Sequence, residues 1–277
     1  MRKHSSIAVA LFATAFVAAF AIQGHAALFV NASALVVVTC GTAAAVFLCY
    51  PAGDLVAALR VTLNAYREPP PTEREVIDSL LELALVSRGK GVLVLERMGE
   101  QSTISFLKRA LGLLIDGFKD EELTEILHAE MRHFRQRRAQ FERIFRQAAL
   151  FAPAFGVAGS VLGLVDMLAG ISQTTEAIQA IPMALTAPLY GIVLANALFF
   201  PAAEAIHAKT QRELLNQQLI TDGVLAIRHE PNPRRLAVKL ESFLTPSART
   251  LEQRSLQDIR DRLRGLRAAS LAASGVV

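Results

Sequence analysis

Two long stretches of this chain contain no lysine or arginine. After Lys3 the next basic residue is Arg60, and after Arg146 the next is Lys209, although the 277 residues include 29 Lys and Arg. A lysine or arginine at the centre of a bilayer costs about 2.5–3.5 kcal/mol on insertion scales. Each stretch is long enough for two spans of about 20 residues. The sequence therefore predicts two helical hairpins in a membrane.

The apolar runs within these stretches place four spans. Their approximate bounds are Ile7–Ile22, Phe29–Cys49, Ala148–Leu168 and Ile181–Ala202. The short connector inside each hairpin has no Lys or Arg, whereas the N-terminus, the loop 52–147 and the tail 203–277 hold all of them. By the positive-inside rule, both termini and the large loop face the cytoplasm.

The remaining chain is also predicted to be helical. Apolar residues recur at three- and four-residue steps through 121–147, and no breaker separates this stretch from the third span, so one helix is predicted to run through both. The fourth span likewise continues toward Gly223. Shorter helices are predicted at 73–87 and 103–116, after a linker at 67–73, and the end of the chain, 247–277, is predicted to be loosely ordered.

The predicted fold class is thus an all-α membrane protein with four transmembrane helices and a large cytoplasmic helical loop and tail. Its segments are a first transmembrane hairpin (1–51), a cytoplasmic loop (52–147), a second transmembrane hairpin (148–202) and a cytoplasmic helical tail (203–277). The first span has a second interpretation, because its basic start, apolar run and Gly-His-Ala end also fit a cleaved signal peptide. Cleavage would leave the basic loop outside the cell, which favours a span.

Motifs of enzyme chemistry are scarce in this sequence. The histidines show no metal-ligand spacing beyond His128 and His133 on a charged helix. Cys40 and Cys49 lie too far apart on one predicted helix to form a disulfide. The arginine-rich stretch 132–146 has apolar residues interleaved at helical spacing, which favours a solvated helix face over nucleic-acid binding. No enzymatic activity, metal site, cofactor or nucleic-acid partner is predicted.

Six motifs occur in order along the chain. They are NASALVVVTCGTAAAVFLCYP (31–51), RGKGVLVLE (88–96), LGLLIDGFKDEELTEIL (111–127), APAFGVAGSVLGL (152–164), ALTAPLYGIVLAN…P (184–201) and PNPRRLAVKLESFL (231–244). Together with the spans and the size of the loop, they resemble the MotA-type stator subunit of the bacterial flagellar motor, a relative of the TolQ and ExbB channel proteins. The resemblance covers roughly residues 1–246.

The resemblance implies a pentamer of this subunit around a dimer of a MotB-like partner in the bacterial inner membrane. It also implies that ion flow turns the ring against the rotor protein FliG. An intramembrane acid is costly and kept only for function, and the predicted spans contain almost no ionisable group. The essential carboxylate is therefore expected to come from another protein, and the resemblance places a membrane Asp on the partner's single span. Membrane lipid is the remaining expected partner.

Small residues follow one face of the third span. Gly156, Gly159, Ser160 and Gly163 recur at three- and four-residue steps. Lipid offers no hydrophobic drive for association, so small faces let another helix approach closely. The resemblance makes this face a channel wall built for close packing and sliding contact, and a static contact between helices is the alternative.

Two prolines fall inside predicted helices near the cytoplasmic ends of their spans. Pro153 frees the carbonyl of Ala149, and Pro201 frees that of Ala197. A freed carbonyl can bind water or an ion, and a kink can act as a hinge. The resemblance assigns both prolines a function and adds Tyr190 to the channel and hinge residues. The alternative is a tolerated kink.

The transported ion is predicted to be H+, with Na+ as the alternative. Sodium-driven members of the resembled family carry a threonine pair on the fourth span, where this chain has Ala187 and Pro188. Thr186 points off that face. Two other oxygens could serve as ligands: Ser160 provides a hydroxyl on the third span, and Pro188 frees the carbonyl of Ala184. Because Na+ needs several oxygen ligands, losing one favours the proton.

Charged positions complete the expected site. Arg88 and Glu96 match the pair that faces the rotor in the resembled family, and Asp166 is either a solvated residue at the outer end or a polar mouth that attracts cations. The alternative function is a TolQ- or ExbB-like energy-transducing channel subunit of an envelope complex. That group typically has three spans with the loop after the first, so four spans and the tail motif favour the flagellar stator.

Overall fold

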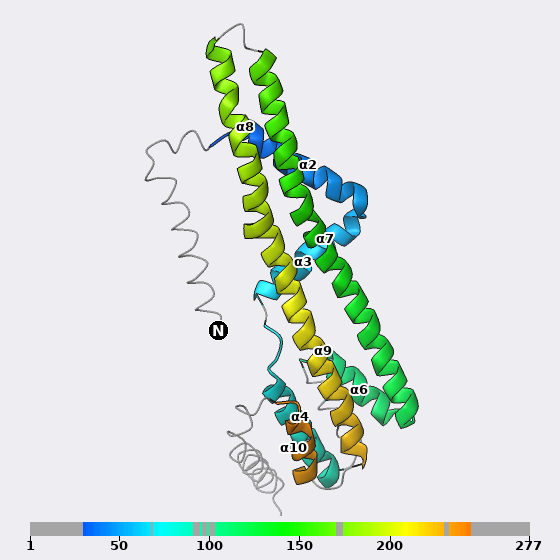
Figure 1. Cartoon of the computed structure of the whole chain (residues 1–277). Coiled ribbons are helices and arrows are strands. Elements are labelled where there is room, and N and C mark those ends of the chain that lie inside the picture. Colours follow the sequence, from blue (N-terminus) through cyan, green and yellow to red (C-terminus); the bar gives the residue numbers. More distant parts are fainter. Residues whose placement is uncertain are drawn as a thin grey trace, which may run out of the picture. The chain divides into compact units, whose positions relative to one another are not determined.

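The structure is a computed structural model that describes residues 30–67, 69–90, 95, 99, 103–169, 174–229 and 233–244. The predicted first span (Ile7–Ile22) and the chain end 247–277 lie outside the described residues. The described elements are all helical (Figure 1). They are α2 (Ala32–Cys49), α3 (Ala52–Arg67), α4 (Glu73–Lys90), α6 (Ser105–Ile115), α7 (Asp120–Ala169), α8 (Thr174–Leu194), the π-helical turn η2 (Ala195–Phe199), α9 (Phe200–His229) and α10 (Pro233–Glu241).

The chain divides into two compact units. Unit 1 comprises residues up to Tyr66 and Ala139–His207, and unit 2 comprises Arg67–Arg138 and the residues from Ala208 onward. The helices α7 and α9 contribute to both units. The unbroken 50-residue α7 confirms the prediction that one helix runs from the loop into the third span.

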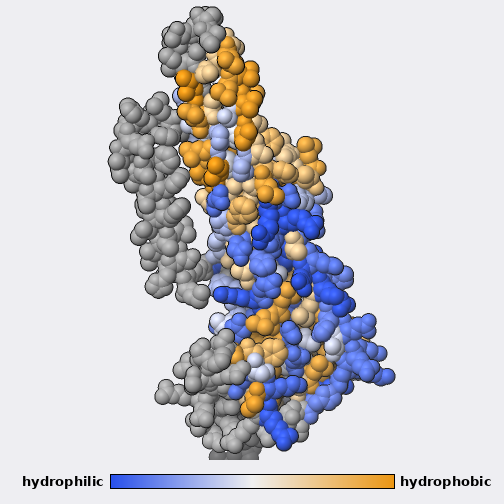
Figure 2. All heavy atoms as spheres, viewed as in Figure 1, coloured by the Kyte–Doolittle hydropathy of each residue, from blue (hydrophilic) through white to orange (hydrophobic). Residues whose placement is uncertain are grey.

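Three described helices are long and apolar enough to cross a membrane. They are Ala32–Cys49, Asp120–Ala169 and Ile181–His229, which confirms apolar helices at the second, third and fourth predicted spans. Hydrophobic residues gather over the end of the α7–α8 hairpin in Figure 2. Their side chains remain exposed, including Val157, Val161 and Leu185, as expected of helices that face lipid rather than water.

The start of α2 is fixed by one asparagine. The Asn31 side-chain oxygen accepts the Ala34 N–H at 2.9 Å, as an N-cap does. The Asn31 backbone N–H donates to the Tyr190 hydroxyl of α8, also at 2.9 Å. The helix ends at Cys49, where the Tyr50 N–H still donates to Val46 and Pro51 prevents continuation. The N-cap residue of α2 is therefore hydrogen-bonded to α8.

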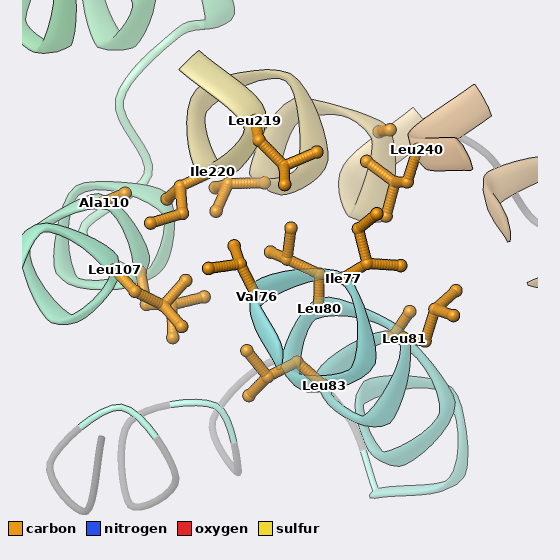
Figure 3. Packing of buried hydrophobic residues seen from close by; sticks show 14 of the residues in the cluster. Val76, Ile77, Leu80, Leu81, Leu83, Leu107, Ala110, Leu219, Ile220 and Leu240 are labelled. Carbon is orange, nitrogen blue, oxygen red and sulfur yellow. The ribbon is translucent and has the colours of Figure 1, made fainter. Parts of the chain in front are cut away.

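Unit 2 has a leucine-rich core. The helix α4 begins with a capping box, in which the Thr72 N–H donates to Glu75 and the Glu75 N–H donates to the Thr72 hydroxyl. One face of α4 then packs against α6, α9 and α10 (Figure 3). The buried side chains from these helices include Val76, Ile77, Leu80, Leu81, Leu107, Ala110, Leu219, Ile220 and Leu240. The predicted shorter helices at 73–87 and 103–116 are confirmed as α4 and α6.

Candidate functional site

The glycines of α7 lie directly against the backbone of α8, and the two helices run side by side in Figure 1. A Cβ built on Gly163 would lie 2.6 Å from the amide nitrogen of Ala184, and one built on Gly156 would lie 2.9 Å from the carbonyl oxygen of Ala187. Both separations are shorter than a real Cβ contact, so the close approach requires glycine. The small-residue face predicted for the third span is therefore occupied by α8 of the same chain.

We call this contact between α7 and α8, which is made at Gly156, Gly159, Gly163 and Gly191, the seam. A Cβ on Gly191 would lie 2.5 Å from the Ala152 carbonyl oxygen and 2.9 Å from the Cα of Pro153. A Cβ on Gly159 would meet the Ala187 methyl at 2.8 Å. Contacts between glycines and backbone in both directions interlock the two helices in the structure. Sliding contact of this face with a partner helix stays a prediction.

The helix α2 packs onto the seam. Ala34 and Val38 of α2 form a fully buried cluster with Ala187 of α8. The Phe155 ring of α7 lies over Gly41, where an added Cβ would come within 2.3 Å of a ring carbon. The three described apolar helices thus form one packed group, with Ser160 half-buried beside the glycines.

The α7 segment around Pro153 packs against the π-helical turn η2 through a cluster of alanines. Ala149, whose carbonyl Pro153 leaves without its helical donor, is buried together with Ala152 and Ala195. Ala195 is the first residue of the π-helical turn η2. The Pro153 segment of α7 and the turn that precedes Pro201 are therefore packed against each other.

The structure places Pro201 differently from the prediction. Instead of lying within a regular helix, Pro201 is the second residue of α9 and follows the π-helical turn η2, in which the Phe200 N–H donates to the Ala195 carbonyl. Proline has no N–H, and its ring clashes with the carbonyl four residues earlier. A widened turn relieves both problems, and such turns occur often at functional sites. The Asn196 side chain donates to the Ile192 carbonyl at 2.9 Å within the same region.

Most of the predicted ion-ligand positions on α8 are buried or hydrogen-bonded within the chain. Ala187 is fully buried in the seam, and Pro188 is half-buried inside the helix. The Thr186 hydroxyl is buried and donates to the Pro182 carbonyl at 2.7 Å. The Tyr190 hydroxyl accepts the N–H of Asn31. No group of three or more His, Cys, Asp or Glu side chains that could hold a metal occurs in the described part of the chain.

A charged cluster, which the sequence did not predict, joins α7 to α9 within unit 1. Glu142 accepts a hydrogen bond from Arg146 Nε at 2.8 Å and pairs with His207 Nδ1 at 3.0 Å. Arg146 also lies 3.5 Å from Glu204. Burial tends to raise the pKa of the Glu142 carboxyl, but its hydrogen bonds to Arg146 and His207 and their positive charge hold the pKa below its usual value. The pair of Glu142 and Arg146 could have been predicted from their four-residue spacing on one helix. The contact with His207 could not, because His207 is distant in the sequence.

The predicted rotor pair cannot be placed as side chains. Arg88 lies in α4, but its side chain is outside the described residues, as is all of Glu96. Asp166 is exposed near the end of α7. Cys40 and Cys49 are free thiols.

The sequence and the fold both match known proteins. The profile of the MotA/TolQ/ExbB proton channel family matches residues 99–218. The chain is 30% identical over 234 residues to the chemotaxis protein PomA of Vibrio alginolyticus, which covers 84% of this chain and 92% of that protein. The structure matches a chain of the flagellar MotAB stator complex from Bacillus subtilis with a TM-score of 0.74, 28% identity and coverage of 80% and 88% of the two chains. It shares the fold of C. jejuni MotAB with a TM-score of 0.79, 24% identity and coverage of 87% and 96%.

Proposed function

We propose that this chain, which belongs to the MotA/TolQ/ExbB proton channel family, is a flagellar motor stator subunit. It forms an ion channel with a MotB-like partner and converts ion flow into torque on the rotor. The similarity to PomA over almost its whole length carries this assignment. The similarity to a stator complex chain at 28% identity agrees with it. A TolQ- or ExbB-like role in an envelope complex is less well supported.

The seam defines what can move in such a channel. Glycine-to-backbone contacts at Gly156, Gly163 and Gly191 interlock α7 and α8, so their apolar parts behave as one rigid hairpin. Flexing is then confined to the level of Pro153 and η2, where the regular hydrogen-bond ladder is interrupted on both helices. In this proposal the hairpin is the channel wall and the two prolines are its hinge.

The chemistry of ion transfer is assigned to the partner. Within the predicted spans, the sequence offers only Asp166 as an acid, and it is exposed near the end of α7. A MotB-like helix supplies the membrane Asp, and a pentamer of this subunit surrounds it in the inner membrane. Both termini and the large loop face the cytoplasm, where the Arg88 and Glu96 region contacts FliG.

The principal test is genetic. Deleting the gene from the source bacterium is expected to abolish swimming, and restoring it together with the neighbouring gene for a one-span, peptidoglycan-binding partner is expected to restore it. A deletion strain that swims normally but has a defective cell envelope would instead favour the TolQ- or ExbB-like role.

The hinge is tested by replacing each proline. Pro153→Leu and Pro201→Leu are expected to abolish swimming while the protein still accumulates and copurifies with its partner, because each change restores a backbone donor and stiffens the helix. Pro69→Leu, in the linker before α4, is the matched control. Normal swimming with leucine at both hinge positions would exclude the hinge.

The transported ion is proposed to be H+. Ala187 and Pro188 have no side-chain oxygen and Thr186 is buried, so these positions offer few ligands to Na+, which needs several oxygens. Swimming speed is expected to fall with a protonophore and to be independent of external sodium. Speed that rises with sodium and survives the protonophore at alkaline pH would assign Na+ instead.

The rotor contact is proposed at Arg88 and Glu96. Surface charge pairs contribute under about 1 kcal/mol each, which suits a contact that must form and release repeatedly. Reversing both charges is expected to reduce swimming without loss of membrane insertion or partner binding. Unchanged motility in the double variant would move the rotor contact elsewhere.

A further inference from the structure

The short helix α3 contacts both of the long helices that carry the hinge prolines. Near its start, the Gln140 side chain of α7 donates to the Asp54 carboxylate at 2.7 Å. One turn further, Ala58 is fully buried against Ile144 and Ala148 of α7. At its other end, the Tyr66 hydroxyl donates to the carbonyl of Pro201 in α9 at 3.1 Å. All these contacts lie within unit 1.

The carbonyl that Tyr66 binds belongs to the hinge proline itself. Pro201 follows η2, the turn in which the helical hydrogen-bond ladder is widened. Helices kink where their hydrogen-bond ladder is disturbed, and the Tyr66 hydroxyl binds α9 directly after such a point. Partial burial raises the pKa of the Tyr66 hydroxyl, which keeps it a proton donor at all physiological pH values.

We propose that α3 is a brace between α7 and α9, and that Tyr66 is a positioning residue that sets the Pro201 hinge through its hydroxyl. The inference rests on the proposed stator function. It adds a residue outside the channel wall, on the helix that follows the second span, to those that determine torque. In this role Tyr66 acts through Pro201 rather than by touching the ion or the partner.

Tyr66→Phe tests the hydroxyl because it keeps the ring and removes the hydrogen bond to Pro201. Tyr50→Phe is the matched control: Tyr50 packs beside the same α3–α7 cluster, and its hydroxyl makes no hydrogen bond to the described residues. Each variant is made in the full chain, expressed with its one-span partner in a stator-deletion strain of the source bacterium. Purified complexes are compared by hydrogen–deuterium exchange, and tethered motors are compared by bead rotation.

Exchange of the amides just after Pro201 is expected to become about three- to tenfold faster in Tyr66→Phe, which is the range that loss of one hydrogen bond produces in an opening equilibrium. Torque per engaged stator unit is expected to fall, while the number of units that engage, counted as steps in rotation speed, is unchanged. A merely structural role would lower the number of units instead. Tyr50→Phe is expected to match the wild type in both measurements.

Four results would overturn the inference: unchanged exchange in Tyr66→Phe, faster exchange with unchanged torque per unit, a loss of rotation that comes from fewer engaged units, or the same effects in Tyr50→Phe. Failure of the proposed function is recognised separately, because the wild-type chain and partner would then fail to restore rotation at all. That result would remove the hinge role of Tyr66 with it, even if the exchange data still detected the hydrogen bond.

Discussion

The helices within unit 1 and the helices within unit 2 pack against one another by opposite means. In unit 1, α7 and α8 meet through glycines and alanines, so backbone lies on backbone at Gly156, Gly163 and Gly191. In unit 2, the helices meet through branched side chains, and leucines such as Leu80 and Leu107 are fully buried. Both groups are all-helical, so the difference lies in what surrounds them rather than in their secondary structure.

The surroundings explain the difference. In water, burying a leucine side chain contributes about 1.5–3 kcal/mol, so a leucine-rich core stabilises unit 2 by hydrophobic burial. Lipid tails are as apolar as leucine, and helices in a membrane therefore associate through close packing of small residues. Unit 1 accordingly leaves its large apolar residues exposed, among them Leu162 and Leu185. Unit 2 should therefore be damaged most by loss of buried volume, and unit 1 by volume added where α7 and α8 meet.

The largest effect is expected from creating a cavity in unit 2. Leu80→Ala removes a fully buried side chain from the centre of the core (Figure 3). It is expected to lower the free energy of unfolding of unit 2 by about 2–5 kcal/mol. Thermal unfolding of the purified complex measures this loss, with Leu35→Ala on an exposed face of α2 as the control. Equal losses at the two positions would contradict the contrast between the units.

Adding one methyl group to the seam comes next. In Gly191→Ala the new Cβ would meet the Ala152 carbonyl oxygen at 2.5 Å, and backbone cannot move aside as a side chain can. Overpacking of this kind costs about 1–3 kcal/mol or more, so reduced thermal stability and reduced swimming are expected. Gly112→Ala in α6 is the control, because nothing lies within 4 Å of its added Cβ. It is expected to be neutral or to gain up to about 1 kcal/mol from helix propensity. A harmless Gly191→Ala would show that the seam is loose.

The same substitution in unit 2 sharpens the comparison. A Cβ on Gly223 would lie 2.5 Å from a methyl carbon of Leu80, the far end of a flexible side chain. Gly223→Ala is therefore expected to cost less than Gly191→Ala, roughly 1 kcal/mol or below. Leu80→Ala removes the obstacle, so the two changes together are expected to be less damaging than the sum of the single effects. Strict additivity in a double-mutant cycle of thermal unfolding would exclude this contact.

The sequence predicted most of the helices because their signals are local. Hydrophobic periodicity and the absence of Lys and Arg located α2, α7 and the fourth span. It also predicted a small-residue face on the third span, from the spacing of Gly156, Gly159 and Gly163. Which helix covers that face depends on tertiary packing, and the answer, α8 of the same chain, has no signature in the spacing.

Other features could not be predicted from the sequence because they too depend on tertiary packing. Proline in an apolar run predicts an interrupted ladder, but the π-helical turn before Pro201 is only one of several ways in which a backbone can accommodate it. Tyr66 and His207 find partners far away along the chain, in Pro201 and Glu142. Contacts of this kind appear only when α3, α7 and α9 are placed together.

The smallest expected effect concerns the charged cluster, where the described part of unit 1 depends on side-chain electrostatics rather than on close packing. The pKa of Glu142 is lowered in the folded protein, where burial opposes ionisation but hydrogen bonds and charge from Arg146 and His207 outweigh it. A group with a lowered folded pKa contributes stability that is fully present above its unfolded pKa, about 4.3 for a glutamate, and is lost as the pH falls through the folded value. The melting temperature of the wild-type complex is therefore expected to fall on acidification below that range.

Glu142→Gln should flatten this part of the profile and lower stability at neutral pH by less than about 1 kcal/mol, because Arg146 and His207 are partly exposed. Glu204→Gln is the matched control, since Glu204 is 67% exposed and lies 3.5 Å from Arg146. If Glu204→Gln flattened the profile as much as Glu142→Gln, the hydrogen bonds of Glu142 to Arg146 and His207 would not be the cause, and general screening of the surface charge would explain the dependence instead.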